Sequence, residues 1–209
     1  MCNILVFYEL QELQFVGGGV IGSVSHDNVF SDIVSLENLF GAWREFRRGK
    51  RKKCEVQEFE FNLEDNLFAL QEVLQVKTYY HGSYESFYVR DPKLRHIHKA
   101  SVRDRIVHQA VFRVLYRIFD PSFIFDSYSC RVGKGAHRAL DRLEVFARRA
   151  SANFTRPLFV LKCDIRKFFA SVEHKALIEI VRSRICDERV QALFVEIIES
   201  FHSTVPGKG

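Results

Sequence analysis

The sequence lacks the cysteine and histidine spacings that hold a structural zinc ion. Its five cysteines are scattered along the 209 residues and include no C-x-x-C pair. Six histidines spread along the chain also fit no zinc pattern, and these are His81, His96, His98, His108, His137 and His174. The cysteines therefore indicate reduced thiols, and surface or core positions are the better interpretation of the histidines.

A hydrophobic run long enough to cross a bilayer is also missing. The apolar, glycine-rich stretch at 15–24 is too short for a spanning helix. It lacks the basic segment that opens a signal peptide, and Glu9 and Glu12 lie just before it. Together with the reduced thiols, these absences predict a cytoplasmic protein without a membrane partner.

The phosphate-binding loop of nucleoside triphosphatases is absent too. Gly133, Lys134 and Gly135 precede a predicted helix, but the G-x-x-x-x-G-K-[ST] spacing is not present. This excludes an NTPase of that class. A polyanion could still approach the start of this helix closely.

The overall composition predicts a soluble globular chain. Hydrophobic residues make up 47% and charged residues 27% of the sequence, which fits one packed domain or two small lobes rather than disorder. The net charge is +5 and the pI is near 9.0. This mild excess of positive charge permits a polyanionic partner without requiring one.

Apolar periodicity predicts a mostly helical chain with one β-hairpin. Residues 1–34 are expected to form a flexible leader, because the glycines at 17–19 and the polar run after them break any element. Ser101 and Asp104 form a capping box at the start of one helix. Helices are expected at 36–46, 63–76 and 101–119, and from 135, 171 and 187 onward, with hairpin strands at 87–90 and 94–98.

Several cations have two interpretations from the sequence alone. A run of six lies between the first two predicted helices and consists of Arg47, Arg48, Lys50, Arg51, Lys52 and Lys53. A solvated turn and a contact to a phosphate backbone explain this run about equally well. Lys93 at the hairpin tip and Arg95 beside it are either solvent-facing charges or cations suited to a triphosphate. Arg103 and Arg105 oppose the dipole of the next helix, which favours a partner.

One carboxylate stands at the end of a short apolar run. Residues 159–163 follow Pro157, precede two basic residues, and predict a buried strand that delivers Asp164. A carboxylate in that position is costly unless it meets a cation or a metal ion. On this stretch alone, a cap for the next helix is the commoner role of such an aspartate.

Four motifs occur here in the order in which one family carries them. They lie at 87–95, 104–110, 127–140 and 162–169, and the third contains Ser-Tyr-x-Cys-Arg-x-Gly-Lys-Gly-x-His. From residue 35 to 209 the chain resembles the N-terminal half of bacterial reverse transcriptases of the retron, group II intron and diversity-generating retroelement kind. The third motif is most similar to that of the diversity-generating enzymes.

The resemblance implies an α+β fold, made of the fingers and part of the palm of a right-hand polymerase and truncated before the second catalytic motif. Residues 35–122 and 173–209 would belong to the fingers, and residues 123–172 would begin the palm. The implied parent activity is that of an RNA-directed DNA polymerase, which adds dNTPs to a primer on an RNA template.

The resemblance also implies roles for individual residues. Asp164 would be the first catalytic aspartate and would hold Mg²⁺ together with the backbone carbonyl of Ile165. Lys93 and Arg95 would bind the triphosphate of the incoming nucleotide. Phe169 would screen the sugar 2′ position, where RNA and DNA building blocks differ.

The nucleic acid itself is expected to meet a wider set of cations. These are Arg47, Arg48, Lys50, Arg51, Lys52, Lys53, Arg103, Arg105, Arg131 and Lys134. The expected partners are an RNA template, a DNA primer and a dNTP, with an accessory protein as a further alternative.

One departure from the family changes what this chain is expected to do. The family supplies its other metal-binding carboxylates from an aromatic-x-Asp-Asp hairpin, and no Tyr/Phe-x-Asp-Asp occurs in this sequence. Paired Mg²⁺ ions need several carboxylates. The chain is therefore expected to be an incomplete and inactive fragment of a polymerase. The alternatives are an RNA-binding module on a polymerase scaffold and an unfolded gene remnant.

Overall fold

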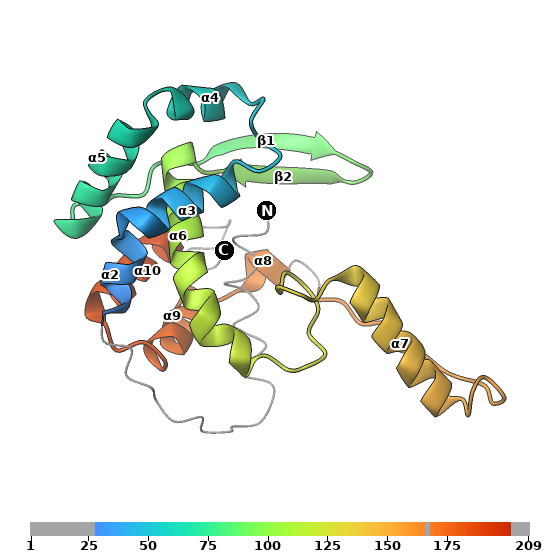
Figure 1. Cartoon of the computed structure of the whole chain (residues 1–209). Coiled ribbons are helices and arrows are strands. Elements are labelled where there is room, and N and C mark those ends of the chain that lie inside the picture. The colour runs from blue at the N-terminus through green and yellow to red at the C-terminus, as the bar shows by residue number, and fades with distance from the viewer. Residues whose placement is uncertain (1–27, 166–167, 202–209) are drawn as a thin grey trace.

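The protein is a mostly helical α+β structure with one small antiparallel sheet (Figure 1). The computed structural model describes residues 28–165 and 168–201. Its elements are α2 (Val29–Val34), α3 (Leu36–Phe46), α4 (Cys54–Phe61), α5 (Leu63–Gln75), β1 (Glu85–Arg90), β2 (Leu94–Lys99), α6 (Val102–Phe119), η2 (Asp120–Ser122), α7 (Ala136–Ala150), α8 (Phe168–Ser171), α9 (His174–Arg182) and α10 (Glu188–Glu199).

Helix α6 is the central element of the helical body, and α3 crosses it (Figure 1). It begins as the capping box predicts, because the Ser101 hydroxyl accepts a hydrogen bond from the backbone N–H of Asp104 at 3.1 Å. Its apolar stripe is buried, with Ile106 and Val107 fully inaccessible. Leu39 and Trp43 of α3 pack in the same core, so the two predicted amphipathic helices bury their stripes together.

The folded part of the chain begins earlier than the sequence predicts. The sequence predicts that residues 29–34 belong to the flexible leader, but they form α2 and contribute Val29, Phe30 and Ile33 to the core. The Phe30 backbone N–H also donates to the Asp187 carboxylate, 157 residues away, at 3.1 Å. A helix this short has too few turns to show periodicity, and its burial comes from tertiary packing. Residues 1–27 of the predicted leader lie outside the described residues.

The predicted hairpin is confirmed. Strands β1 and β2 pair antiparallel, with Tyr88 opposite His96 and Val89 opposite Arg95, across a turn at 91–93. Most residues of both strands are exposed, and Figure 1 shows the hairpin extending away from the helices. Both faces of the hairpin are therefore exposed to solvent over most of their length.

The prediction of a buried strand before Asp164 is wrong. Residues 157–165 have no regular secondary structure, and Phe159 and Leu161 are 92% and 88% exposed. A strand needs a neighbour for its backbone hydrogen bonds, and the one sheet in the described residues contains only β1 and β2. This segment returns along α7, which has no buried residue and extends from the helical body (Figure 1).

Other helix boundaries differ in detail from the prediction. Ser171 does not cap the helix that follows it, because it belongs to the short helix α8 and donates its hydroxyl to the Phe168 carbonyl. Helix α9 has Glu173 as its N-cap instead. Helix α4 was not predicted, and only one of its residues, Val56, is buried. Within the described residues, no helix has the length and apolar character needed to cross a membrane.

Replacing Leu39 by alanine should destabilise the protein strongly. Leu39 lies on α3 and is fully buried in the core. Leu39→Ala should therefore lower the free energy of unfolding by about 2–5 kcal/mol. Leu143 on α7 is a matched control because it is 51% exposed, and Leu143→Ala should change the same quantity by less than about 0.5 kcal/mol. Urea unfolding followed by circular dichroism measures both, and equal effects would contradict the assigned core.

Candidate functional site

The hairpin places its cations on two different faces. Arg95 lies opposite Val89, whereas Arg90 lies opposite Leu94 at the next position along the ladder. Because side chains alternate across a strand, Arg90 and Arg95 face opposite sides, with Lys93 in the turn between them. All three are exposed, and within the described residues none of their side chains forms an ion pair or hydrogen bond. The sequence alone did not identify Arg90 as a candidate, because the face on which it lies depends on the strand register.

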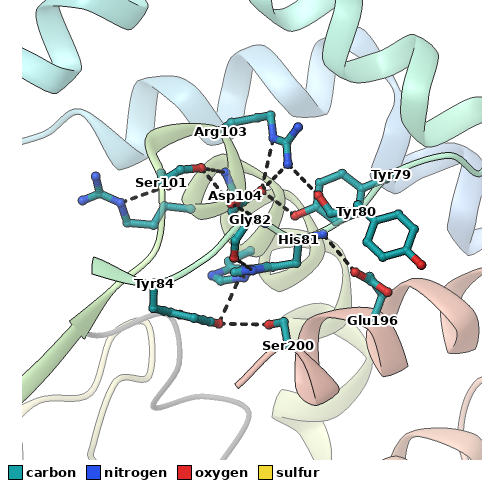
Figure 2. Close-up of polar contacts among 12 residues, drawn as sticks. Tyr79, Tyr80, His81, Gly82, Tyr84, Ser101, Arg103, Asp104, Glu196 and Ser200 are labelled. Atoms are coloured by element: carbon teal, nitrogen blue, oxygen red, sulfur yellow. Dashed lines mark hydrogen bonds and ion pairs between the residues drawn. The ribbon is translucent and has the colours of Figure 1, made fainter. Parts of the chain in front are cut away.

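The root of the hairpin is fixed by the buried carboxylate of Asp104 (Figure 2). This carboxylate accepts hydrogen bonds from the Tyr79 hydroxyl at 2.9 Å, the Ser101 hydroxyl at 2.7 Å and the Gly82 backbone N–H at 3.1 Å. Arg103 adds an ion pair at 3.1 Å. Burial raises the pKa of Asp104, but these hydrogen bonds and nearby positive charge outweigh it, so its pKa lies below the ordinary value.

Gly82 is needed where the chain passes the Asp104 carboxylate. A Cβ atom at this position would lie 2.9 Å from Oδ2 of Asp104. That oxygen already accepts the Gly82 N–H, so a larger residue would push apart a contact that ties the hairpin to α6. The close approach depends on tertiary structure and has no signature in the local sequence.

A histidine pair extends the same network, with His108 buried and His81 half-buried. Nε2 of His81 lies 3.1 Å from Nε2 of His108, and Nδ1 of His81 lies 2.7 Å from the Gly82 carbonyl oxygen. A carbonyl can only accept, so Nδ1 of His81 carries a proton, and His81 and His108 share the hydrogen bond between their Nε2 atoms. Burial is the main cause that lowers the pKa of His108, to about 3.

Helix α10 holds the other side of the hairpin root. The Glu196 carboxylate accepts the backbone N–H of His81 at 2.9 Å, and the hydroxyls of Tyr84 and Ser200 lie 3.1 Å apart (Figure 2). Burial raises the pKa of Tyr84 above its usual value. The hairpin is thus tied to α6 on one side and to α10, more than 100 residues away, on the other.

The basic run at 47–53 divides into paired and open cations. Arg47 forms an ion pair with Glu60, and the Lys50 ammonium donates to the Phe46 carbonyl at 2.6 Å. The other four are exposed and make no side-chain ion pair or hydrogen bond within 28–165 and 168–201. These four are Arg48, Arg51, Lys52 and Lys53.

The two arginines at the start of α6 have partners inside the protein. Arg103 pairs with Asp104 and donates to the Tyr80 carbonyl, and Arg105 donates to the Glu55 carboxylate at 3.0 Å. The unfavourable position of these cations on the helix dipole is thus offset by intramolecular contacts. Their predicted contact with nucleic acid stays a prediction.

Arg131 and Lys134 also hold local structure together. Arg131 pairs with Asp120 at 2.8 Å, and only 9% of its side chain is exposed. Lys134 donates to the Phe125 carbonyl at 2.6 Å, and its ammonium lies 3.8 Å from the centre of the Phe125 ring. Lys134 also lines an open pocket of about 410 Å³ beside α7, together with Arg138 and Arg142.

Asp164 and Ile165 are exposed at the end of the irregular segment 157–165. Within the described residues, the Asp164 carboxylate makes no hydrogen bond or ion pair. Phe169 lies in α8, and its side chain lies outside the described part of the chain. The structure therefore reports no contact that brings Asp164 together with the hairpin cations.

The donor set does not fit the expected pair of Mg²⁺ ions. Two-metal sites need several carboxylates around both ions. Among residues 28–165 and 168–201, no group of three or more His, Cys, Asp or Glu side chains could hold a metal ion. Asp164 and the carbonyl of Ile165 are thus at most part of such a site.

Sequence comparison relates part of the chain to two larger proteins. It is 30% identical over 113 residues to Protein YkfC of Escherichia coli, a match that covers 54% of this chain and 29% of YkfC. It is 32% identical over 98 residues, or 47% of this chain, to an uncharacterized 91 kDa protein in the cob intron of Schizosaccharomyces pombe, of which 11% is covered. The chain thus spans less than a third of either relative. No family model matches it.

The stability of the protein should fall as the pH drops below about 6.5. An unfolded histidine takes up a proton near pH 6.5, whereas folded His108, with a pKa of about 3, stays neutral. The unfolded state therefore binds the extra proton between these values, and the free energy of unfolding decreases by roughly 1.4 kcal/mol per pH unit from this group. The lowered pKa of Asp104 places its own effect below about pH 4.

Urea unfolding between pH 7.5 and 5 measures this dependence. His108→Gln, which keeps a hydrogen-bond donor, should show a shallower fall in stability than the natural chain. His137→Gln on exposed α7 is the control and should follow the natural chain. Parallel pH profiles for all three proteins would contradict the assignment of His108 as a buried neutral group.

Proposed function

We propose that the chain is part of an RNA-directed DNA polymerase and supplies the fingers and the beginning of the palm. The observation that carries the proposal is the projecting hairpin, whose exposed cations Lys93 and Arg95 have no competing side-chain partner within the described residues. A rigidly rooted arm with open cations suits the triphosphate of an incoming nucleotide. In this role Lys93 and Arg95 position the nucleotide, and Phe169 selects against a 2′-hydroxyl.

The sequence similarities support this proposal without extending to the whole reaction. One of the two relatives is named for its place in an intron, the kind of element to which the resembled reverse transcriptases also belong. The matched regions cover 54% and 47% of this chain. The parent reaction, dNTP addition to a primer 3′-OH on an RNA template, is proposed for the complete polymerase.

A second candidate function is RNA binding without catalysis. The observation that favours it is the lone Asp164, since the described residues hold no cluster of donors for a metal ion. The open cations of the basic run would then bind phosphates, and Asp164 would have no role. Under the first candidate, Asp164→Asn should abolish primer extension by the complete polymerase, whereas under the second Asp164 has no role. Both candidates predict RNA binding.

RNA binding should depend on the open cations of the basic run, three of which can be replaced together. The triple variant Arg51→Ala, Lys52→Ala and Lys53→Ala should make the fall of log affinity with log salt shallower. The slope for a single-stranded RNA should decrease in magnitude by about 2, because three phosphate contacts are lost. Fluorescence anisotropy over a salt series measures this slope.

A triple variant elsewhere on the surface controls for the change in net charge. Arg117→Ala, Lys175→Ala and Arg182→Ala together remove three exposed cations from α6 and α9 and should leave the slope unchanged. If both triple variants lower the slope equally, net charge alone explains the binding and the basic run is not the contact surface.

Primer extension should require carboxylates that the described residues do not bring to Asp164. The purified chain, incubated with a primed RNA template, dNTPs and Mg²⁺, should add no nucleotides above background, since one carboxylate cannot hold two metal ions. Extension that disappears in Asp164→Asn would contradict this expectation and would show that the chain completes its own site. Gel analysis of a labelled primer gives the answer.

A further inference from the structure

A continuous line of ring contacts, some stacked and some tilted or edge-to-face, runs from the exposed hairpin into the protein interior. Neighbouring ring centroids are between 4.3 and 5.3 Å apart. From the exposed end to the buried end, the rings are those of Tyr88, His96, His98, Phe201, Tyr84, His81 and His108. The rings come from β1, β2, the segment before β1, the residues after α10, and α6. No single segment of the sequence therefore indicates the line.

The exposed end of the line offers an open aromatic surface. Tyr88 and His96 are cross-strand partners whose rings lie 4.5 Å apart at an interplanar angle of 11°. The Tyr88 side chain is nevertheless 67% exposed. Within the described residues no ring packs on the second face of Tyr88, so a further flat ring could extend the stack there.

The buried end of the line holds these rings in place. His81 stacks between Tyr84 and His108, at 4.9 and 5.1 Å, and His108 is almost fully buried in α6. The backbone of His81 is bonded to Glu196, as Figure 2 shows. A ligand that stacks on Tyr88 would therefore meet a preorganised ring and would lose little affinity to ordering it.

The charges around the exposed rings suit a polyanion. Arg90 shares the face of Tyr88 and His96, and Lys93 lies in the adjoining turn. From 86 to 98, Asp91 is the only acidic residue, against the three cations Arg90, Lys93 and Arg95. Flat rings beside open cations are the combination with which proteins bind unpaired nucleic-acid strands, because every base has a face that stacks.

We propose that Tyr88, backed by His96, is a stacking platform for an unpaired base of a single-stranded RNA. The occupant rests on the proposed function, in which the template is RNA. The bound base would stack on the open face of Tyr88, and Arg90 on the same face would contact the phosphates beside it. This site recognises the flat face of a base and not its hydrogen-bonding edge, so it binds without sequence preference.

The experiment measures binding of a short single-stranded RNA that carries 2-aminopurine. Tyr88→Leu should weaken the affinity of the whole chain about 5- to 100-fold and reduce the quenching of the fluorescent base. The salt slope should not change, because no cation is removed. Tyr88→Phe keeps the ring and should bind as the natural chain does.

Two controls separate stacking from a loss of structure or charge. Phe87→Leu removes a neighbouring aromatic ring from the opposite face of the hairpin and should leave affinity unchanged. An abasic strand of the same length has the phosphates without the bases, so the natural chain and Tyr88→Leu should bind it equally. A loss of abasic binding in Tyr88→Leu, or an equal effect of Phe87→Leu, would overturn the platform.

The outcomes also separate this inference from the proposed function. If Tyr88→Leu binds RNA as tightly as the natural chain while the Arg51, Lys52 and Lys53 triple variant still binds weakly, the platform is wrong and the RNA-binding function stands. If the natural chain binds no RNA, both proposals fail.

Discussion

The placement of the hairpin depends on the buried carboxylate of Asp104. A carboxylate in the interior is costly unless its oxygens accept hydrogen bonds or meet positive charge. Here the donors include Tyr79 and Gly82, which lead into β1, and Ser101, which precedes α6. The need to satisfy one buried charge therefore joins the root of the hairpin to the central helix. Removing one donor would leave part of that charge uncompensated, so these contacts act together.

The same network determines which parts of the hairpin remain available. The root is buried and hydrogen-bonded to α6 and α10, whereas the outer residues of both strands are open to solvent. Within the described residues, Lys93 and Arg95 therefore have no ion pair that an incoming anion would first have to break. By contrast, Arg105 and Arg131 are held by Glu55 and Asp120. The structure thus sorts cations that are equivalent in the sequence into internal and open groups.

The apolar surface beside α7 has a different origin. Leu140 and Leu143 on that helix and Phe159 and Leu161 on the returning chain are all more than half exposed. Burying such side chains would stabilise the protein by about 1.5–3 kcal/mol each, a gain that the described residues do not realise. In the proposed polymerase, the run before Asp164 would become a strand only beside further strands.

Local signals in the sequence determined most helices and the hairpin. The Ser101 cap and the stripe of α6 predict that helix, and Asp91 and Pro92 between alternating residues predict the turn of the hairpin. These features depend on residues that are a few positions apart in the sequence. The run of cations at 47–53 can likewise be recognised from a short stretch of sequence. The helix α2, the close approach at Gly82, the His81–His108 pair and the ring line depend on residues far apart in the chain, so only the tertiary structure could decide them. It also decided against the strand before Asp164, because hydrophobicity favours burial but a strand forms only where another strand can accept its hydrogen bonds.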